Sequence, residues 1–443
     1  MLCYLRRFHP MITPDDLVFS RGLRGFRSLV RCPLTVIAGL ILALPLSAAT
    51  GLPVAAPDAV TGFSAQRLLR VGAYLQRTVD AHQYAGATWL VARDGKIVAQ
   101  GAVGFSDVAA RAPMTENNIF AIASMTKLVT VVTALTLLEE GRFHLDEPVA
   151  TYLPELANLK VLTGGTADAP QLAPLARPVT IRHLLTHTAG FTYGLFEPEP
   201  FRGIYAAAKL DESTSLADHV VRAAKLPLKF QPGDAFNYGI SIDLIGALVE
   251  KITGQPLETV MRERIFVPLG MKDTGFSPAD PARLAKYYAR DGKGGFEART
   301  RPVVPRAGTF VNPGGGLFST LPDYARFAQM LLNRGELDGV RVLGRKTVEL
   351  MTSNQVEYLN PRPKDRWVPP GFGFGVRVRR DDRGEFETLG SPGQFGWEGL
   401  TTTYVSIDPH ERMFVLLLTQ HAPYDEDFIF EKFTNTVYQA LDK

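Results

Sequence analysis

The chain has 443 residues, with 48 lysines and arginines against 45 aspartates and glutamates. Six of the arginines and only two of the acids lie in residues 1–49, so the remainder is close to neutral and gives no support to a nucleic-acid partner. The only two cysteines, Cys3 and Cys32, lie in the same stretch. Residues 50–443 can therefore hold no disulfide, cysteine nucleophile or cysteine metal site.

Residues 1–49 have the pattern of a signal peptide. Four arginines at positions 21–31 precede an apolar run, Leu34 to Leu46, and the small residues Ser47-Ala48-Ala49 offer a cleavage site. The run is shorter than the roughly 18 apolar residues that a membrane span needs. We expect an exported bacterial protein, periplasmic or secreted, that begins near Thr50 and keeps no stable membrane span. An uncleaved N-terminal anchor is the alternative, and the true start codon stays open.

Helix and strand patterns at both ends of the remaining chain surround a long central part that is mostly helix and loop. Helical patterns are expected at 64–84, 180–188, 241–252, from 320 onward and at 427–441, and strands at 87–92, 97–103, 373–379, 400–407 and 413–419. These predict an α+β fold in which the N- and C-terminal parts build one antiparallel sheet flanked by helices. The expected α/β lobe spans about 64–112 and 370–443, and the expected helical lobe spans about 113–369.

Ser124-Met-Thr-Lys127 is the only S-x-x-K sequence in the chain, and it precedes a run of helix formers, Leu128 to Glu140. If a helix begins near Ser124, residues three apart lie on one face, so the lysine amine lies beside the serine hydroxyl. The N-terminus of a helix also favours developing negative charge. A serine hydroxyl becomes a strong nucleophile when a neighbouring base takes its proton, and a lysine serves as that base when burial or nearby positive charge lowers its pKa. Taken alone, the pattern is more typical of a serine helix cap followed by a surface lysine.

Three further features are candidate partners of the serine. Tyr238 precedes a predicted helix, Gly396-Trp-Glu-Gly-Leu400 precedes a predicted strand, and glycines 314–316 form a loop. Each one alone is more typical of packing or of a turn. His183 and His187 have a spacing that can hold a metal, but the glutamate of an H-E-x-x-H motif is absent, so we expect no metal and no cofactor.

Together these motifs resemble the serine β-lactamase-like superfamily, and most closely its family VIII carboxylesterases. The resemblance runs from about residue 64 to 440. Two further motifs within this range contribute to it, Thr180–Gly190 and Asp323–Phe327. It implies the fold of class C β-lactamases and penicillin-binding proteins. By this resemblance Ser124 is the acylated nucleophile, and Lys127 and Tyr238 share its proton. The backbone N–H groups of Ser124 and Leu400 form the oxyanion hole, and Trp397, Gly399 and Ile240 contact the substrate.

Two positions depart from the penicillin-recognising pattern. Trp397-Glu398-Gly399 stands where Lys-Thr-Gly is usual, and Tyr238-Gly-Ile240 stands where Tyr-x-Asn is usual. The groups that would hold a carboxylate and an amide are therefore missing. We expect a serine hydrolase that cleaves small-molecule carboxylic esters through an acyl-enzyme. The alternatives are a β-lactamase, D-amino-acid peptidase or amidase of the same superfamily, and a non-catalytic binding or assembly protein on this fold. The sequence does not predict the oligomeric state.

Overall fold

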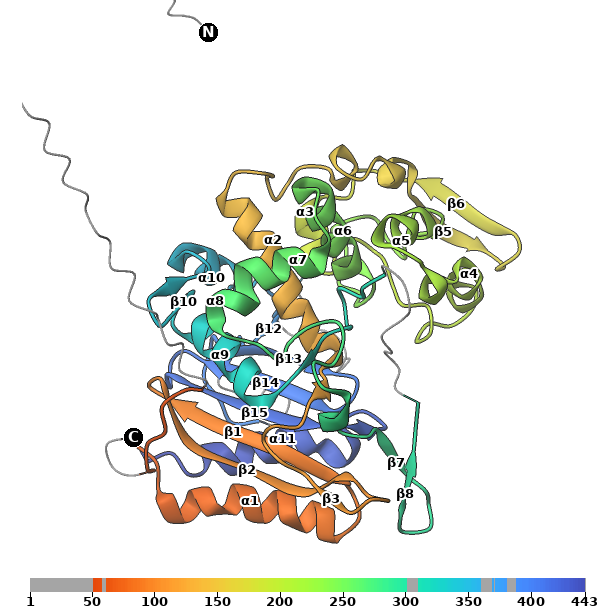
Figure 1. The fold of residues 1–443 in the computed structure, drawn as a ribbon. Helices are drawn as coiled ribbons and strands as arrows, with labels where there is room; N and C mark the ends of the chain where they lie inside the picture. The colour runs from red at the N-terminus through yellow and green to blue at the C-terminus, as the bar shows by residue number, and fades with distance from the viewer. Residues whose placement is uncertain are drawn as a thin grey trace, which may run out of the picture. The chain divides into compact units, whose positions relative to one another are not determined.

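The two ends of the chain build one seven-stranded antiparallel sheet (Figure 1), and the α+β prediction is confirmed. The strand order is β12-β13-β14-β15-β1-β2-β3. The strands span Gly86–Arg93 (β1), Lys96–Asp107 (β2), Ala112–Pro113 (β3), Arg377–Val378 (β12), Phe395–Gly399 (β13), Thr403–Asp408 (β14) and Met413–Thr419 (β15). The computed structural model describes residues 51–57, 61–300, 310–359, 369, 371–380 and 388–442. The predicted signal peptide and both cysteines lie outside these residues.

The pairing of β1 with β15 joins the two ends of the chain at the centre of the sheet. Every residue of both strands is buried, and Leu90 stands opposite Leu416. A strand that is apolar on both faces needs cover on both faces, which predicts a layer of helices on each side. β1 and β2 form a hairpin that turns at Asp94-Gly95, where both residues have positive φ.

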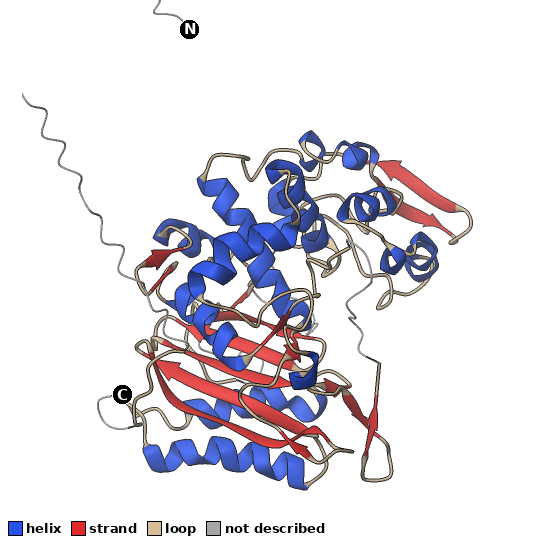
Figure 2. Cartoon of the chain, viewed as in Figure 1, coloured by secondary structure: helices blue, strands red, loops and turns tan. Residues whose placement is uncertain are grey.

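Helices cover both faces of this sheet (Figure 2). On one face lie α1 (Ala65–Asp80) and α11 (Ile429–Tyr438), whose apolar stripes form one core cluster with the sheet. The Ser64 hydroxyl caps α1 by accepting the N–H of Arg67. On the other face α9 (Leu321–Leu332) lies across β14, β15 and β1, and the Thr320 hydroxyl caps it.

The helical insert is organised around α2 (Thr126–Glu139) and α6 (Ser241–Thr253), which pack against each other. Twelve residues of α2 are buried, so it is a central helix and not an amphipathic surface helix. The remaining helices are α3 (Ile181–Leu185), α4 (Phe201–Ala208), α5 (Leu216–Ala223), α7 (Leu257–Met261), α8 (Val267–Leu269) and α10 (Arg345–Met351). None of the described helices is both long and apolar enough to cross a membrane.

Several small sheets of two or three short strands lie outside the main sheet, and the sequence analysis did not predict them. They are β5 (Lys160–Gly165) with β6 (Pro170–Pro174), β10 (Glu336–Leu337) with β11 (Val340–Arg341), β4 (Phe120–Ala121) with β9 (Phe318–Ser319), and the three-stranded set β16 (His421–Ala422), β7 (Tyr288–Arg290) and β8 (Phe296–Ala298). Most are two or three residues long, which is too short for a local period of two to mark them.

Several predicted boundaries move. The helix expected near Ser124 begins at Thr126, because Ala123–Met125 forms a 3₁₀ turn in front of it. The strand expected at 400–407 begins at Thr403, since residues 400–402 make the turn from β13 and Thr402 has φ of 60°. Residues 395–399, read from sequence as a turn before a strand, are a strand themselves. Of the run 373–379, only Arg377–Val378 pairs with a neighbouring strand.

Candidate active site

Ser124 and Lys127 meet as the S-x-x-K spacing predicts. The 3₁₀ turn and the first turn of α2 place the Lys127 ammonium 3.1 Å from Ser124 Oγ, to which it donates. Lys127 is only 1% exposed, and it also donates to the carbonyl of Gly314 at 2.5 Å. The lysine is thus withdrawn from water and held at the serine by a fixed second acceptor. A merely capping serine followed by a surface lysine would not have this geometry.

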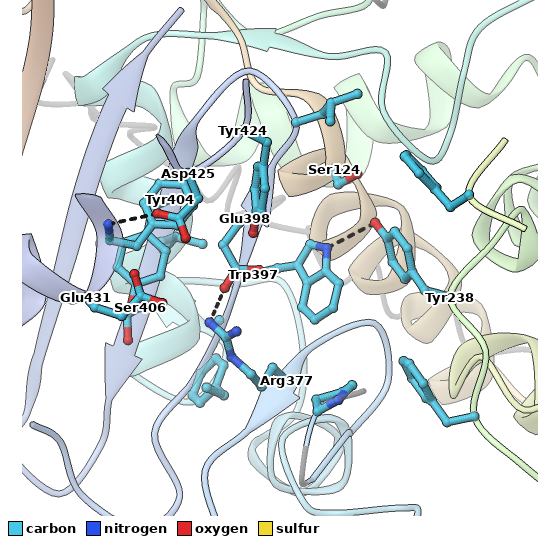
Figure 3. Close-up of a pocket in the computed structure, with 18 of the residues that line it drawn as sticks. Ser124, Tyr238, Arg377, Trp397, Glu398, Tyr404, Ser406, Tyr424, Asp425 and Glu431 are labelled. Atoms are coloured by element: carbon cyan, nitrogen blue, oxygen red, sulfur yellow. Dashed lines mark hydrogen bonds and ion pairs between the residues drawn. The ribbon is translucent and has the colours of Figure 1, made fainter. Parts of the chain in front are cut away.

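Tyr238 closes the other side of this pair. Its ring lies 4.8 Å from the Lys127 nitrogen, and it lies three residues before the first residue of α6. The phenol oxygen accepts a hydrogen bond from Trp397 Nε1 at 3.1 Å (Figure 3). The indole N–H therefore reaches the tyrosine oxygen from the strand position where the usual pattern has a lysine. It stabilises negative charge on that oxygen, as a cation would, but without carrying a charge itself.

The end of β13 lies beside the segment that precedes Ser124. The hydroxyls of Thr401 and Thr403 donate to the carbonyls of Ala121 and Ile122, at 2.7 and 3.1 Å. A Cβ on Gly399 would lie 2.4 Å from the Ile122 oxygen, so only glycine permits this approach. Leu400 follows directly and lines the same cavity as Ser124. Residues separated by nearly 280 positions are thereby brought together at the predicted oxyanion site.

Glu398 points away from Trp397, as strand alternation predicts (Figure 3). Its carboxylate pairs with the guanidinium of Arg377 on the neighbouring strand β12. That guanidinium also lies 6.0 Å from the Trp397 ring centre. The negative charge of Glu398 is thus compensated by the neighbouring Arg377 guanidinium.

Ile240 does not line the cavity, although the sequence analysis placed it among the substrate contacts. It is 3% exposed and belongs to the main hydrophobic core. As the N-cap residue of α6 it has turned inward, and Trp397, Tyr238 and Leu400 form the wall in its place. Gly399 likewise lies against Ile122 and not along the cavity wall.

The cavity that Ser124 opens into has a volume of about 900 Å³. Its wall carries many aromatic and apolar side chains, among them Phe196, Phe236, Trp397, Leu400 and Tyr424. Lys229 also lines it, but its ammonium is held at 2.8 Å by both Glu197 and Asn237. The space is large enough for a drug-sized molecule and is mainly suited to neutral groups.

The two histidines of the predicted α3 region have local structural roles. His183 Nδ1 accepts the N–H of Thr180 and completes a capping box. His187 is fully buried, and its Nδ1 accepts the N–H of Gly239, beside Tyr238. Burial, together with the charge of Lys127, lowers the pKa of His187 well below its usual value. Within the described ranges no group of three or more potential metal ligands occurs.

Tyr193 is a neighbour of the site that the sequence analysis missed. Its ring lies 5.5 Å from the Lys127 nitrogen and 5.5 Å from the Tyr238 ring. Burial raises the pKa of Tyr193 well above its usual value, so it stays a neutral phenol. The sequence did offer a signal for Tyr193, because it lies three residues after the Thr180–Gly190 motif, which was already part of the resemblance.

Comparison with known proteins identifies the family. Residues 71–435 match the Beta-lactamase family. The chain belongs to that family. Among its relatives, Esterase EstB of Burkholderia gladioli is 30% identical over 83% of this chain and 93% of EstB. Protein Rv1367c of Mycobacterium tuberculosis (strain ATCC 25618 / H37Rv) is 34% identical over 79% of this chain and 89% of that protein.

Solved structures agree with this assignment. This Beta-lactamase family protein superposes on EstCE1, a hydrolase with promiscuous acyltransferase activity, with a TM-score of 0.72 at 25% identity, over 86% of this chain and all of EstCE1. It superposes on unliganded simvastatin synthase LovD from Aspergillus terreus with a TM-score of 0.72 at 26% identity, over 86% and 98% of the two chains. Taken with the family, these relatives identify the protein as a hydrolase.

Proposed function

We propose that this protein hydrolyses carboxylic esters through an acyl-enzyme on Ser124. The observation that carries the proposal is the buried Lys127 ammonium 3.1 Å from Ser124 Oγ, with Tyr238 on its other side. Two relatives named as esterases, EstB and the lovastatin esterase of Penicillium rubens, support ester substrates.

In the first half-reaction Ser124 Oγ attacks the ester carbonyl carbon as its proton passes to the Lys127–Tyr238 pair. The backbone N–H groups of Ser124 and Leu400 receive the developing oxyanion, and the hydrogen-bonded turn 400–403 holds the second donor in place. Collapse of the tetrahedral intermediate breaks the bond to the alcohol, which leaves with the proton from the pair. A water molecule then attacks the acyl-serine and gives its proton to the same pair; the bond from the acyl carbon to Ser124 Oγ breaks, and the pair returns the proton to Ser124 Oγ as the acid leaves.

The cavity favours neutral esters with sizeable apolar groups. Its wall carries many aromatic side chains, and of the three described cations that line it Lys229 and Arg377 are each met by a carboxylate, while Arg379 donates to the hydroxyl and the carbonyl of Thr388. A substrate carboxylate would have to displace one of these partners or stay without a partner, and a buried unpaired carboxylate is costly. A neutral ester needs only the nucleophile, the oxyanion donors and apolar surface.

Labelling with a fluorophosphonate probe tests the proposal directly. The wild-type protein should be labelled covalently at Ser124, and Ser124→Ala should lose both labelling and p-nitrophenyl butyrate hydrolysis while it keeps the wild-type melting temperature. Ser241→Ala is the control, because Ser241 is another serine at a helix start, but it is buried and does not line the cavity. It should be labelled normally. Labelling that maps to a different serine would refute the assignment of Ser124, and a wild-type protein that neither reacts nor hydrolyses would favour a non-catalytic role.

A further inference from the structure

A buried carboxylate is separated from the lysine of the site by a single residue, Gly314. Asp243, in the first turn of α6, is 3% exposed, and its Oδ1 accepts the N–H of Gly314 at 3.0 Å. The carbonyl of the same glycine accepts the Lys127 ammonium at 2.5 Å. Gly314 therefore connects a buried acid to the buried ammonium, with one group on each side of it.

The segment that carries Gly314 is clamped between two helices. The Thr130 hydroxyl on α2 donates to the Pro313 carbonyl at 2.7 Å, and the Pro313 ring fills the space that a side chain on Gly246 of α6 would need. A Cβ on Gly314 would lie 2.8 and 2.9 Å from the two carboxylate oxygens of Asp243. Because this space is closed, the position of the Gly314 carbonyl follows the position of the Asp243 carboxylate.

An ammonium withdrawn from water requires acceptors or an opposite charge nearby. The atoms that Lys127 bonds to, Ser124 Oγ and Gly314 O, are both neutral. Within the described part of the chain, the titratable groups that face it from other elements are Tyr193, Tyr238 and His187, and burial keeps the histidine neutral. The carboxylate of Asp243 lies on the other side of the same glycine, so an acidic group stands behind the second acceptor of Lys127. Tyr193 and His219 are titratable groups that face Asp243, and burial lowers the pKa of His219.

We infer that Asp243 is a positioning residue of the hydrolytic site. It fixes the Gly314 carbonyl as the second acceptor of Lys127, and its charge sets the proton balance between Lys127 and its partners. The inference rests on the proposed acyl-enzyme chemistry, but it concerns a residue that touches neither the substrate nor the nucleophile.

Asp243→Asn separates the two contributions, because the amide oxygen still accepts the Gly314 N–H while the charge is gone. We expect kcat/KM for p-nitrophenyl butyrate to fall about tenfold or more. The acidic limb of its pH profile should move to lower pH, because a negative charge beside the proton-accepting groups of the site is lost. Asp323→Asn is the matched control. Asp323 is another buried carboxylate in the first turn of a helix that accepts a backbone N–H, at 2.7 Å, but it lies at α9 and does not contact Gly314 or Lys127. It should keep the wild-type limb.

Gly314→Ala provides a second test that alters no charged group. Its Cβ meets the Asp243 carboxylate, so the substitution should lower kcat in the wild-type background and much less so in an Asp243→Ala background, where the space is open. Additive losses in this cycle, or a wild-type pH profile and rate in a folded Asp243→Asn protein, would overturn the inference. Failure of the proposed function is recognised separately, because Ser124→Ala would then retain hydrolysis.

Discussion

Replacement of Trp397 by phenylalanine isolates the hydrogen bond on which the Tyr238 oxygen depends. Phenylalanine keeps an aromatic ring against Tyr238 and Phe372, whose ring centres lie 5.2 and 5.5 Å from that of Trp397, but it removes the N–H donor at 3.1 Å. The packing of the wall is largely preserved, so the kinetic effect reports mainly on the donor.

The size of the effect depends on the charge that Tyr238 carries during acylation. A hydrogen bond to a neutral phenol is worth about 0.5–1.5 kcal/mol, and one to a charged oxygen about 1.5–3 kcal/mol. Because about 1.4 kcal/mol corresponds to a tenfold change in rate, a proton-accepting Tyr238 predicts a roughly 10–100-fold loss of kcat. The KM should change little, since the substrate does not need the indole N–H.

Steady-state hydrolysis of p-nitrophenyl butyrate and the rate of fluorophosphonate labelling measure this loss, and thermal unfolding reports the state of the fold. Trp89→Phe is the matched control, because Trp89 is a similarly buried tryptophan, 7% against 9% exposed, in the core cluster on the α1 side of the sheet. It should lower the melting temperature without changing kcat. A Trp397→Phe protein within twofold of the wild-type kcat would refute the role of this hydrogen bond. Equal kcat losses in both variants would attribute the effect to packing alone.

Three further outcomes are expected. Lys127→Ala and Tyr238→Phe should each slow acylation by roughly 10²–10⁴-fold. The rate of the double variant should fall by less than the product of the two factors, because both residues act on one proton. Multiplicative losses in stopped-flow labelling would show that they act independently. Hydrolysis of p-nitrophenyl acetate or butyrate should be readily measured, while nitrocefin should be turned over far more slowly because Lys229 and Arg377 are already paired with acids. Comparable kcat/KM values on the ester and on nitrocefin, lost together in Ser124→Ala, would make this a β-lactamase. Burial raises the pKa of Asp323 to about 6, so the stability that this group contributes is full below pH about 4 and is lost as pH rises through 6. The free energy of unfolding of Asp323→Asn should therefore exceed that of the wild type by about 2–3 kcal/mol at pH 8 and equal it at pH 4. A difference in chemical denaturation that does not change with pH would contradict this.

The sequence by itself was sufficient for the features that depend on short-range order. The spacing of Ser124 and Lys127 predicts that they share one face near a helix start, and they do so even though the turn there is 3₁₀ and the α-helix begins at Thr126. The strand at Met413–Thr419 and the helix expected from 320 onward, observed as Leu321–Leu332, follow for the same reason. Each is encoded by residues within a few positions of one another, so period and turn chemistry determine it.

Only the tertiary structure decided what meets across long separations. No local pattern states that the indole of Trp397 reaches the hydroxyl of Tyr238, that Arg377 meets Glu398, or that Ile240 turns into the core. The contacts of Trp397 and Glu398 follow from the sheet, which joins strands from opposite ends of the chain and fixes side-chain direction by strand register. Ile240 turns inward because it stands at the start of α6, which packs in the core of the helical insert. The bridge from Asp243 through Gly314 to Lys127 is of the same kind: three segments far apart in sequence converge because α2 and α6 pack against each other and leave room between them for a glycine alone.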